Sequence, residues 1–237
     1  MSEARDVGVV IVAGGSGTRA AGSGGGSELK QFRWVAGKPA LLHSLQAFMA
    51  RPDVVSVVCV LPREFAGDPP PWIFQCDVDR LMIAPGGRTR TESVANGLDD
   101  LPDEASIVLV HDAARPLVGD DTIDRVVMAV RSGGEQCAVA ALPVVDTLKE
   151  VDEAGRIVRT VERDRLWRAQ TPQGFPRGVI VRAHREARAQ RLSATDDAAL
   201  CERLGIPVLV VRGSERAMKI TDESDFARAE ALFTLPE

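Results

Sequence analysis

The sequence predicts an α/β fold with a mostly parallel sheet, and its hydrophobic pattern supports this class in two ways. Short β-branched runs that are apolar on both faces alternate along the chain with amphipathic stretches of helical length. Strands that are apolar throughout are typical of parallel sheets with helices on both faces. Regular strand–helix alternation also produces right-handed βαβ crossovers. We therefore expect a single Rossmann-like domain, residues 1–237, built on an open sheet between two layers of helices.

The individual elements follow from these runs and from residues that start or end helices. Pro39 and Pro176 stand at first-turn positions, and Gly133 and Gly205 stand where helices should end. The expected strands are Val7–Val12, Val54–Leu61, Leu81–Ala84, Ile107–Val110, Ala138–Leu142 and Val208–Val211. The expected helices are Pro39–Met49, Thr91–Leu101, Asp120–Arg131, Pro176–Gln190, Asp196–Leu204 and Glu223–Leu232.

One segment, residues 144–161, departs from this alternation. Its sequence, VVDTLKEVDEAGRIVRTV, alternates apolar and polar residues on both sides of DEAG, a pattern typical of a β-hairpin. Gly155 would supply the positive φ of the turn. A two-stranded ribbon is unstable alone and must pack against something. We therefore predict a protruding β-hairpin arm, at about residues 143–163, that forms a homodimer with a second copy of the chain.

The composition argues against nucleic acid and membranes as partners. The chain is 45% hydrophobic and 27% charged, a balance typical of soluble globular proteins. A net charge of −5 without a basic stretch disfavours nucleic acid. The longest apolar runs are too short for a membrane span, and residues 1–6 lack the apolar region of a signal peptide. The scattered cysteines predict neither a disulfide nor a metal site. We therefore expect a cytoplasmic protein.

Polar segments rich in glycine and arginine follow the ends of several predicted strands. They are AGGSGTR (13–19), APGGRTR (84–90), HDAARP (111–116) and LPVVDT (142–147). In an open parallel sheet, ligands bind beyond the carboxyl ends of the strands. Arginines among glycines and threonines suit a small phosphorylated ligand. One polar turn would mean little alone, but the matching positions of these segments predict a binding site.

The first segment formally matches the dinucleotide fingerprint G-x-G-x-x-A, which raises a nicotinamide-dependent reductase as an alternative. That fingerprint should open directly into a helix, whereas Gly22–Gly26 are poor helix residues. The acidic residue expected about 20 residues later is also missing. We instead interpret the loop as backbone N–H groups around a triphosphate, with Arg19 and Lys30 as cations. A solvated surface lysine is the alternative for Lys30.

The next two segments each allow a functional and a purely structural interpretation. The glycine pair at 86–87 would let the backbone approach a flat ligand, and Ser93 falls where a helix begins and can serve an anion. Helix capping is the alternative for the neighbouring threonines. Asp112, at the end of a buried strand, needs a cation beside it. Arg115 could supply that cation internally, or the two could hold a cation-bound phosphate, while we interpret His111 as structural.

Taken in order, the segments resemble one family, the 2-C-methyl-D-erythritol 4-phosphate cytidylyltransferases of the non-mevalonate isoprenoid pathway. The resemblance extends from Val9 to Phe233 and rests on AGGSGTR…KQ, GGxxRxxSV, VLVHDAARP, PVVDTLK, TVxR…LWxAQTPQGF, TDDA and MKIT. It implies transfer of CMP from CTP to the polyol phosphate, with release of pyrophosphate and with Mg²⁺ or another divalent cation. The ribitol-5-phosphate cytidylyltransferases have a similar pattern and remain an alternative, although HDAARP and DTLK favour methylerythritol phosphate.

The resemblance also implies roles for residues that match the motifs of the family. The implied catalytic residues are Arg19, Lys30 and Lys219. The implied CTP contacts are Ala13, Gly14, Gly15, Gly86, Arg90, Ser93 and Asp112. The implied sugar-phosphate contacts are Asp112, Arg115, Thr147, Arg163, Thr195 and Lys219. Thr147 and Arg163 would reach into the site of the partner subunit, and Mg²⁺ would be held by the CTP phosphates with Asp112 as a candidate ligand.

The sequence departs from the family pattern around its first loop. Leu29 stands where the family usually has proline before its loop lysine, and Arg88 stands where an acidic residue is common. The loop between Arg19 and Lys30 is longer than usual because of the segment Gly22–Ser27. We interpret this Gly/Ser segment as a hinge that lets Lys30 move over bound CTP.

Overall fold

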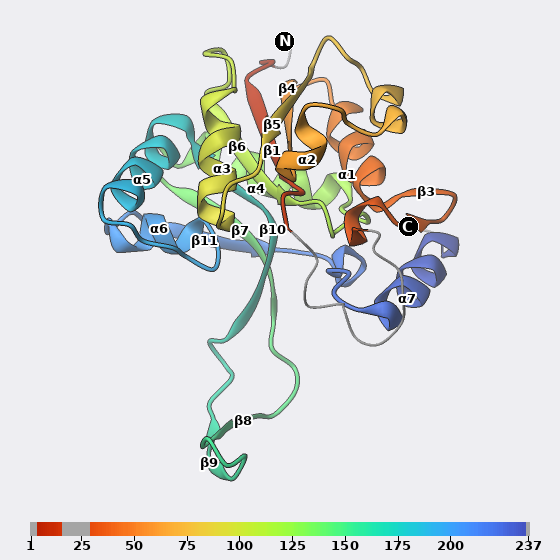
Figure 1. Cartoon of the computed structure of the whole chain (residues 1–237). Helices are drawn as coiled ribbons and strands as arrows, with labels where there is room; N and C mark the ends of the chain where they lie inside the picture. The colour runs from red at the N-terminus through yellow and green to blue at the C-terminus, as the bar shows by residue number, and fades with distance from the viewer. Residues whose placement is uncertain (1–3, 16–28, 236–237) are drawn as a thin grey trace.

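Seven strands form the central sheet of the computed structural model, which describes residues 4–15 and 29–235 (Figure 1). Their order across the sheet is β11-β7-β10-β6-β1-β4-β5, and every pair of neighbours is parallel except the two that involve β10. The predicted open, mostly parallel sheet is therefore confirmed. The strands are β1 (Val7–Val12), β4 (Val54–Leu61), β5 (Leu81–Pro85), β6 (Ile107–Asp112), β7 (Cys137–Pro143), β10 (Trp167–Pro176) and β11 (Val208–Arg212).

The strand β10 has no counterpart among the predicted strands. It lies between β6 and β7 and is antiparallel to both. Its sequence, WRAQTPQGFP, contains two prolines and a glycine, residues that are depleted in strand interiors. The ladder accommodates Pro172 because the pairing of β10 with β7 is interrupted between Ala169 and Gln173, whereas Gly174 and Pro176 lie at paired positions. β10 is therefore a central strand with a polar, irregular middle.

Helices cover both faces of the sheet, as predicted. Alternate residues of β1 point to opposite faces, so that Val9 and Ile11 pack into one core and Val10 packs into the other. Each face buries a separate apolar cluster between the sheet and its helices. The helices on one face are α1 (Ala40–Met49) and α4 (Asp120–Ser132), and those on the other are α3 (Arg90–Asp99), α5 (Arg177–Ala189) and α6 (Ala198–Arg203).

The helix ends agree with most of the sequence signals. Pro39 and Pro176 are the N-cap residues of α1 and α5, and Gly133 is the C-cap of α4. The helix expected from Asp196 begins instead at Ala198, because the preceding residues take part in side-chain hydrogen bonds at the edge of the sheet. Within the described ranges, no helix is both long enough and apolar enough to cross a membrane.

The C-terminal helix α7 (Glu223–Thr234) begins with a capping box formed by Asp222 and Asp225. Its apolar residues Phe226 and Ala229 pack in a small separate cluster with Val35. This packing joins the end of the chain to the segment that follows the first loop. The remaining short elements are η2 (Lys30–Phe32), β2 (Trp34–Val35), β3 (Lys38–Pro39), α2 (Arg63–Ala66), η3 (Pro71–Gln75) and η4 (Glu215–Ala217).

The predicted hairpin is present and projects away from the body of the molecule (Figure 1). Its strands are β8 (Leu148–Val151) and β9 (Ile157–Val161), and Gly155 takes the positive φ of 76° that the turn requires. The apolar side chains of Val151 and Ile157 are 53% and 65% exposed. The hairpin arm therefore presents an apolar surface that its own chain leaves in contact with solvent.

Candidate active site

Two loops approach each other closely at the carboxyl edge of the sheet. Gly14 follows β1 and Gly86 follows β5, and a Cβ atom added to Gly14 would lie 3.2 Å from the Cα of Gly86. A Cβ added to Gly86 would lie 3.1 Å from the carbonyl oxygen of Leu61. Glycine at both positions is what lets these backbones lie together. The structure thus brings together the predicted nucleotide contacts Ala13–Gly15 and Gly86.

Gln31, to which the sequence analysis gave no role, fixes the backbone of the loop that follows β1. Its buried amide Nε2 donates to the carbonyl oxygens of Ala13 at 2.6 Å and Gly15 at 3.2 Å. The adjacent residue, Lys30, therefore lies beside this loop. The Lys30 Nζ donates a hydrogen bond to the carbonyl oxygen of Thr221.

Two predictions for this loop lie on residues outside the described ranges. These are the cation Arg19 and the hinge Gly22–Ser27. Lys30 itself does not line the cavities described below. Its proposed contact with the phosphates therefore rests on the resemblance and on its place beside the first loop.

The loop after β5 is shaped by the start of α3. The Ser93 hydroxyl donates to the carbonyl oxygen of Thr89 at 2.9 Å and accepts from the backbone N–H of Gly87 at 3.0 Å. Thr89 caps the helix by accepting from the backbone N–H of Glu92 at 3.1 Å. The capping alternative therefore holds for Thr89. Ser93 lies on the first turn as predicted, and in this structure its hydroxyl holds the glycine loop in place.

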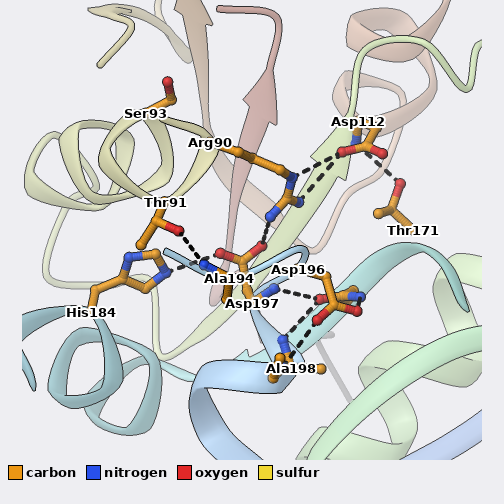
Figure 2. A network of polar contacts seen from close by, with 12 residues as sticks. Arg90, Thr91, Ser93, Asp112, Thr171, His184, Ala194, Asp196, Asp197 and Ala198 are labelled. Atoms are coloured by element: carbon orange, nitrogen blue, oxygen red, sulfur yellow. Dashed lines mark hydrogen bonds and ion pairs between the residues drawn. The ribbon is translucent and has the colours of Figure 1, made fainter. Parts of the chain in front are cut away.

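Asp112, at the end of β6, is the centre of a cluster of cationic side chains. Its carboxylate lies 2.7 Å from the Lys219 Nζ, 3.4 Å from Arg90 and 3.9 Å from the Nε of Arg115. Arg90 also contacts Asp197 on the loop before α6 (Figure 2). Four of the predicted site residues, from three separate segments of the chain, therefore meet at one point.

These cations determine the charge state of Asp112. Burial alone would raise the pKa of its carboxyl group, but Lys219, Arg90 and Arg115 hold that pKa well below its usual range. Asp112 is therefore ionised at neutral pH. Arg90 is also paired with Asp197, and Asp196 lines the same cavity, so the site offers an anion several N–H donors in fixed positions rather than a large net positive charge.

A cavity of about 240 Å³ opens at this cluster. Among the predicted residues, Arg90, Asp112, Arg115, Thr195 and Lys219 line it. Its other lining residues are Asp196 and, from β10, Ala169, Gln170, Thr171 and Gln173. The structure therefore places the residues predicted to contact the sugar phosphate from the domain body, Asp112, Arg115, Thr195 and Lys219, around one cavity.

A second cavity of about 300 Å³ adjoins the first and shares Arg115 and Lys219 with it. Arg168 and Arg228 add two further cations to its wall, and Glu215 and Asp225 are its carboxylates. Together the two cavities form a polar depression, in which five arginine and lysine side chains face the four carboxylates of Asp112, Asp196, Glu215 and Asp225. Such a surface suits a ligand with several phosphates.

Arg115 has a buried N–H donor without a hydrogen-bond partner within this polar depression. Its Nη1 donates to the carbonyl oxygen of Ala217 at 2.8 Å, which fixes the direction of the guanidinium. Its Nε is buried and has no hydrogen-bond partner among the described residues. A buried donor without a partner carries an energetic cost. An incoming phosphate oxygen is the kind of acceptor that would remove this cost.

His111 is structural, as its sequence context indicated. Its Nε2 lies 3.2 Å from the carbonyl oxygen of Arg115 and its Nδ1 lies 3.0 Å from the Thr171 hydroxyl. Burial lowers the pKa of His111 to about 4, so the ring is neutral at pH 7. Because the Thr171 hydroxyl also accepts from the Asp112 backbone N–H at 3.0 Å, His111 helps to fix the end of β6.

Thr147 and Arg163 are not brought into the cavity. Both are exposed on the hairpin arm, which projects away from the body of the molecule (Figure 1). The Arg163 guanidinium donates to the carbonyl oxygen of Val145, which is also part of the arm. Thr147 and Arg163 line neither cavity of their own chain, and their contact with substrate in a partner subunit stays a prediction.

The sequence analysis missed the residues of β10 that support the cavity. Gln173 Oε1 accepts from the backbone N–H groups of Asp197 and Ala198, each at 3.1 Å, and so holds the loop that carries Thr195. Gln170 Nε2 donates to the carbonyl oxygen of Ser214 at 2.9 Å and holds the segment before Lys219. The motif AQTPQGF contained both glutamines, but without the strand assignment nothing in the sequence gave them a direction.

The donor set fits a divalent ion only if the substrate brings most of its ligands. Among the described residues, no group of three or more His, Cys, Asp and Glu side chains could hold a metal ion. Asp112 lines the cavity, and its oxygens already accept hydrogen bonds from Lys219 and Arg90. Mg²⁺ is commonly held by one or two carboxylates together with substrate phosphates. The residues present fit that arrangement.

The fold and the site define an α/β protein with a polar depression, lined by several arginines and a lysine, beyond the carboxyl ends of its strands, where ligands bind in open α/β sheets. The family model of 2-C-methyl-D-erythritol 4-phosphate cytidylyltransferase matches residues 7–235. The chain therefore belongs to this cytidylyltransferase family. Membership makes it an enzyme of the nucleotidyltransferase type.

Individual relatives agree with the family match over the full length of the chain. The 2-C-methyl-D-erythritol 4-phosphate cytidylyltransferase of Streptomyces coelicolor is 43% identical over 235 residues, with 94% of this chain and 83% of the relative covered. That of Syntrophus aciditrophicus is 39% identical, with 96% of both chains covered. The crystal structure of the enzyme from Thermus thermophilus is similar with a TM-score of 0.78 at 36% identity, covering 97% of this chain and 100% of that one.

Proposed function

We propose that this protein transfers CMP from CTP to 2-C-methyl-D-erythritol 4-phosphate, giving 4-diphosphocytidyl-2-C-methyl-D-erythritol and pyrophosphate in non-mevalonate isoprenoid biosynthesis. The observation that carries the proposal is the cluster of Arg90, Arg115 and Lys219 around the ionised Asp112, in a chain that matches the family from residue 7 to residue 235. The family match also favours a transferase over the nicotinamide-dependent reductase that the first loop raised as an alternative.

The proposed reaction needs no general base. A phosphate monoester is already largely dianionic at neutral pH because its second pKa is about 6. One of its oxygens attacks the α-phosphorus of CTP and forms a new P–O bond. The bond from the α-phosphorus to the bridging oxygen breaks, and the electron pair leaves with pyrophosphate. The barrier comes from repulsion between anions and from charge on the leaving oxygen, so fixed cations and N–H donors should provide the catalysis.

The residues divide this task according to their positions. Arg19 and Lys30, beside the first loop, would neutralise the charge that develops on the CTP phosphates. Ala13–Gly15 and Gly86 would give the cytidine and phosphates close access to backbone. Lys219 would hold the attacking phosphate in line for displacement, with Asp112, Arg115 and Thr195 around the polyol phosphate. Bound Mg²⁺, or another divalent cation, would neutralise charge on the CTP phosphates, with Asp112 as its candidate carboxylate ligand.

The substrate assignment is tested by pyrophosphate release from CTP, with 2-C-methyl-D-erythritol 4-phosphate and ribitol 5-phosphate compared side by side. We expect efficient turnover of the first polyol phosphate and little of the second. Faster turnover of ribitol 5-phosphate would support the alternative cytidylyltransferase. Turnover of neither would contradict the proposed function and leave the fold unaffected.

We also propose that the protein acts in the cytoplasm.

We further propose that the active enzyme is a homodimer in which the hairpin arm of one subunit completes the site of the other. The proposal is supported by the exposed apolar residues of the arm, by the projection of the arm from the body of the molecule, and by cavity walls that include neither Thr147 nor Arg163 of the same chain. Because each site would then combine the body of one subunit with the arm of the other, variants in different parts should complement each other.

Mixed dimers provide a direct test of this shared site. An Arg163→Ala subunit paired with a Lys30→Ala subunit would keep one site with an intact body and an intact arm. We expect each heterodimer to recover about half of the wild-type turnover, because one of its two symmetric sites is restored. The matched control pairs Lys30→Ala with Lys219→Ala, both in the domain body, and should stay inactive. A confirmed Arg163→Ala/Lys30→Ala heterodimer without activity would rule out the shared site.

A further inference from the structure

Two buried polar side chains, His184 and Asp197, form a chain of contacts that ends on Arg90 (Figure 2). The Arg90 Nη1 lies 2.6 Å from one carboxylate oxygen of Asp197. The other Asp197 oxygen lies 3.0 Å from the Nε2 of His184, on α5. Neither Asp197 nor His184 was assigned a role by the sequence or by the family resemblance. The ion pair of Arg90 with Asp197 is shorter than its 3.4 Å contact with Asp112.

The three groups differ in their access to solvent. The side chain of Asp197 is 1% exposed and that of His184 is 4% exposed, whereas that of Arg90 is 23% exposed and lines the cavity. Burial alone would raise the pKa of Asp197, but Arg90 and His184 hold that pKa below its usual range, so the buried carboxylate is charged. Arg90 is therefore paired with the buried charge of Asp197 on the side away from solvent, while part of its own side chain stays exposed in the cavity.

The Asp197 carboxylate is fixed in direction as well as in charge. A carboxylate can only accept hydrogen bonds, so the Nε2 of His184 carries a hydrogen and donates it to Asp197. The Nδ1 of His184 is buried and has no partner among the described residues. Gln173 holds the Asp197 backbone N–H at 3.1 Å. Both the side chain and the backbone of Asp197 are thus tied to neighbouring elements.

Stability alone does not account for this arrangement. A buried ion pair loses its hydration, and replacing such a pair with apolar residues is often neutral or stabilising. The unpartnered Nδ1 of His184 adds a further cost. What the arrangement does provide is a fixed direction for Arg90. Without the charge on Asp197, the guanidinium would turn to Asp112 as its remaining acid, and Asp112 would then compete with a phosphorylated ligand for it.

We propose that Asp197 is a positioning residue, held by His184, that keeps the Arg90 guanidinium directed into the cavity and available to CTP. The proposal rests on the proposed function, because Arg90 is a CTP contact only in that reaction. Asp197 touches no substrate in this account and acts through Arg90. His184 acts one step further back, by fixing the carboxylate that fixes the guanidinium.

The test compares the kinetics of Asp197→Asn with those of the wild-type enzyme. We expect the KM for CTP to rise about 5- to 20-fold, a change that lies within the range of couplings measured between residues in contact. The kcat at saturating CTP should change less than about threefold, because the lost interaction is one of binding. His184→Ala should act in the same direction but more weakly. His184→Gln keeps an N–H donor and should restore the KM toward the wild-type value.

A double-mutant cycle distinguishes positioning from general loosening of the fold. If Asp197 acts through Arg90, Asp197→Asn should add little to the KM of an Arg90→Ala variant. The matched control is Asp53→Asn, which also removes a buried acid from an arginine pair, with Arg51 at 2.9 Å, but at the opposite edge of the sheet. It should lower stability without raising the KM for CTP.

Each result decides the proposal. An unchanged KM for Asp197→Asn, or a rise that persists in full in the Arg90→Ala background, would overturn it. If Asp197→Asn does not fold, the His184→Ala and His184→Gln pair carries the same test. Calorimetric binding of CTP to the wild-type and variant proteins keeps the proposed function separate. A wild-type enzyme that binds CTP without turnover would contradict the function, and unequal CTP affinities would still support the positioning role.

Discussion

Replacement of Lys30 by alanine should lower kcat by roughly two to three decades, the size of effect seen when a transition-state donor is removed. Gln31 fixes the neighbouring loop through the carbonyl oxygens of Ala13 and Gly15, which places Lys30 beside the expected phosphates. A cation there matters most when charge builds on the leaving oxygen. The KM for the polyol phosphate should change much less, because that substrate contacts the other side of the α-phosphorus. Steady-state kinetics with both substrates measure the difference.

Lys38→Ala is the matched control for this experiment. Lys38 is exposed, and its Nζ donates to the side chain of Gln46 at 2.7 Å, away from both cavities. Its removal takes away the same charge from the same region of sequence and should leave kcat unchanged. A kcat for Lys30→Ala equal to that of the wild-type enzyme would contradict the catalytic assignment of Lys30 and favour a solvated surface lysine.

Asp112→Asn should destabilise the folded protein by about 3 kcal/mol at pH 7, the lower end of the cost of breaking a buried ion pair. Asparagine has nearly the same shape but removes the charge, so Arg90 and Arg115 would lose the anion that they share. The cost should not reach the upper end, because the Lys219 side chain is 44% exposed and can be hydrated. Urea unfolding of the two proteins measures the difference, with the exposed Asp99→Asn as control.

The same pair of proteins yields a prediction about pH. The pKa of Asp112 is lower in the folded state than its value of about 3.9 in an unfolded chain. As the pH falls, the unfolded chain therefore takes up the proton first, and the wild-type protein loses stability. The stability difference between wild type and Asp112→Asn should be constant from neutral pH down to about pH 5 and should shrink below about pH 4. A constant difference across that range would show that charge is not its cause.

The sequence predicted the parts of the fold that depend on regular hydrophobic patterns. β1 and β4 are continuous apolar runs, and their observed bounds, Val7–Val12 and Val54–Leu61, are those expected. The hairpin arm followed from its alternation around Gly155. β10 was missed because its polar side chains, prolines and glycine resemble a loop, and what makes it a strand is its pairing with β6 and β7. The local hydrophobic pattern of a segment does not reveal tertiary pairing of this kind.

The candidate site was likewise predicted only in part. The motifs identified the charged residues that face the cavity, such as Asp112, Arg115 and Lys219. The residues that hold them in place were not found, because Gln173 and Asp197 act through neighbours far away in sequence. Their side chains resemble those of any polar loop until the fold shows what lies opposite. The residues that position the site are therefore identified by their contacts in the fold, and not by a sequence motif.

β10 also has a mechanical consequence, because a single strand runs from the base of the hairpin arm into the wall of the cavity. Its first residues, Trp167 and Arg168, are exposed near the arm, and Gln170 to Gln173 line the cavity a few residues later. The arm and this part of the cavity wall are therefore connected by one continuous strand. Lengthening or shortening the chain between Val161 and Gln170 would change the reach of the arm and the registration of the wall together, so neither can be redesigned without the other.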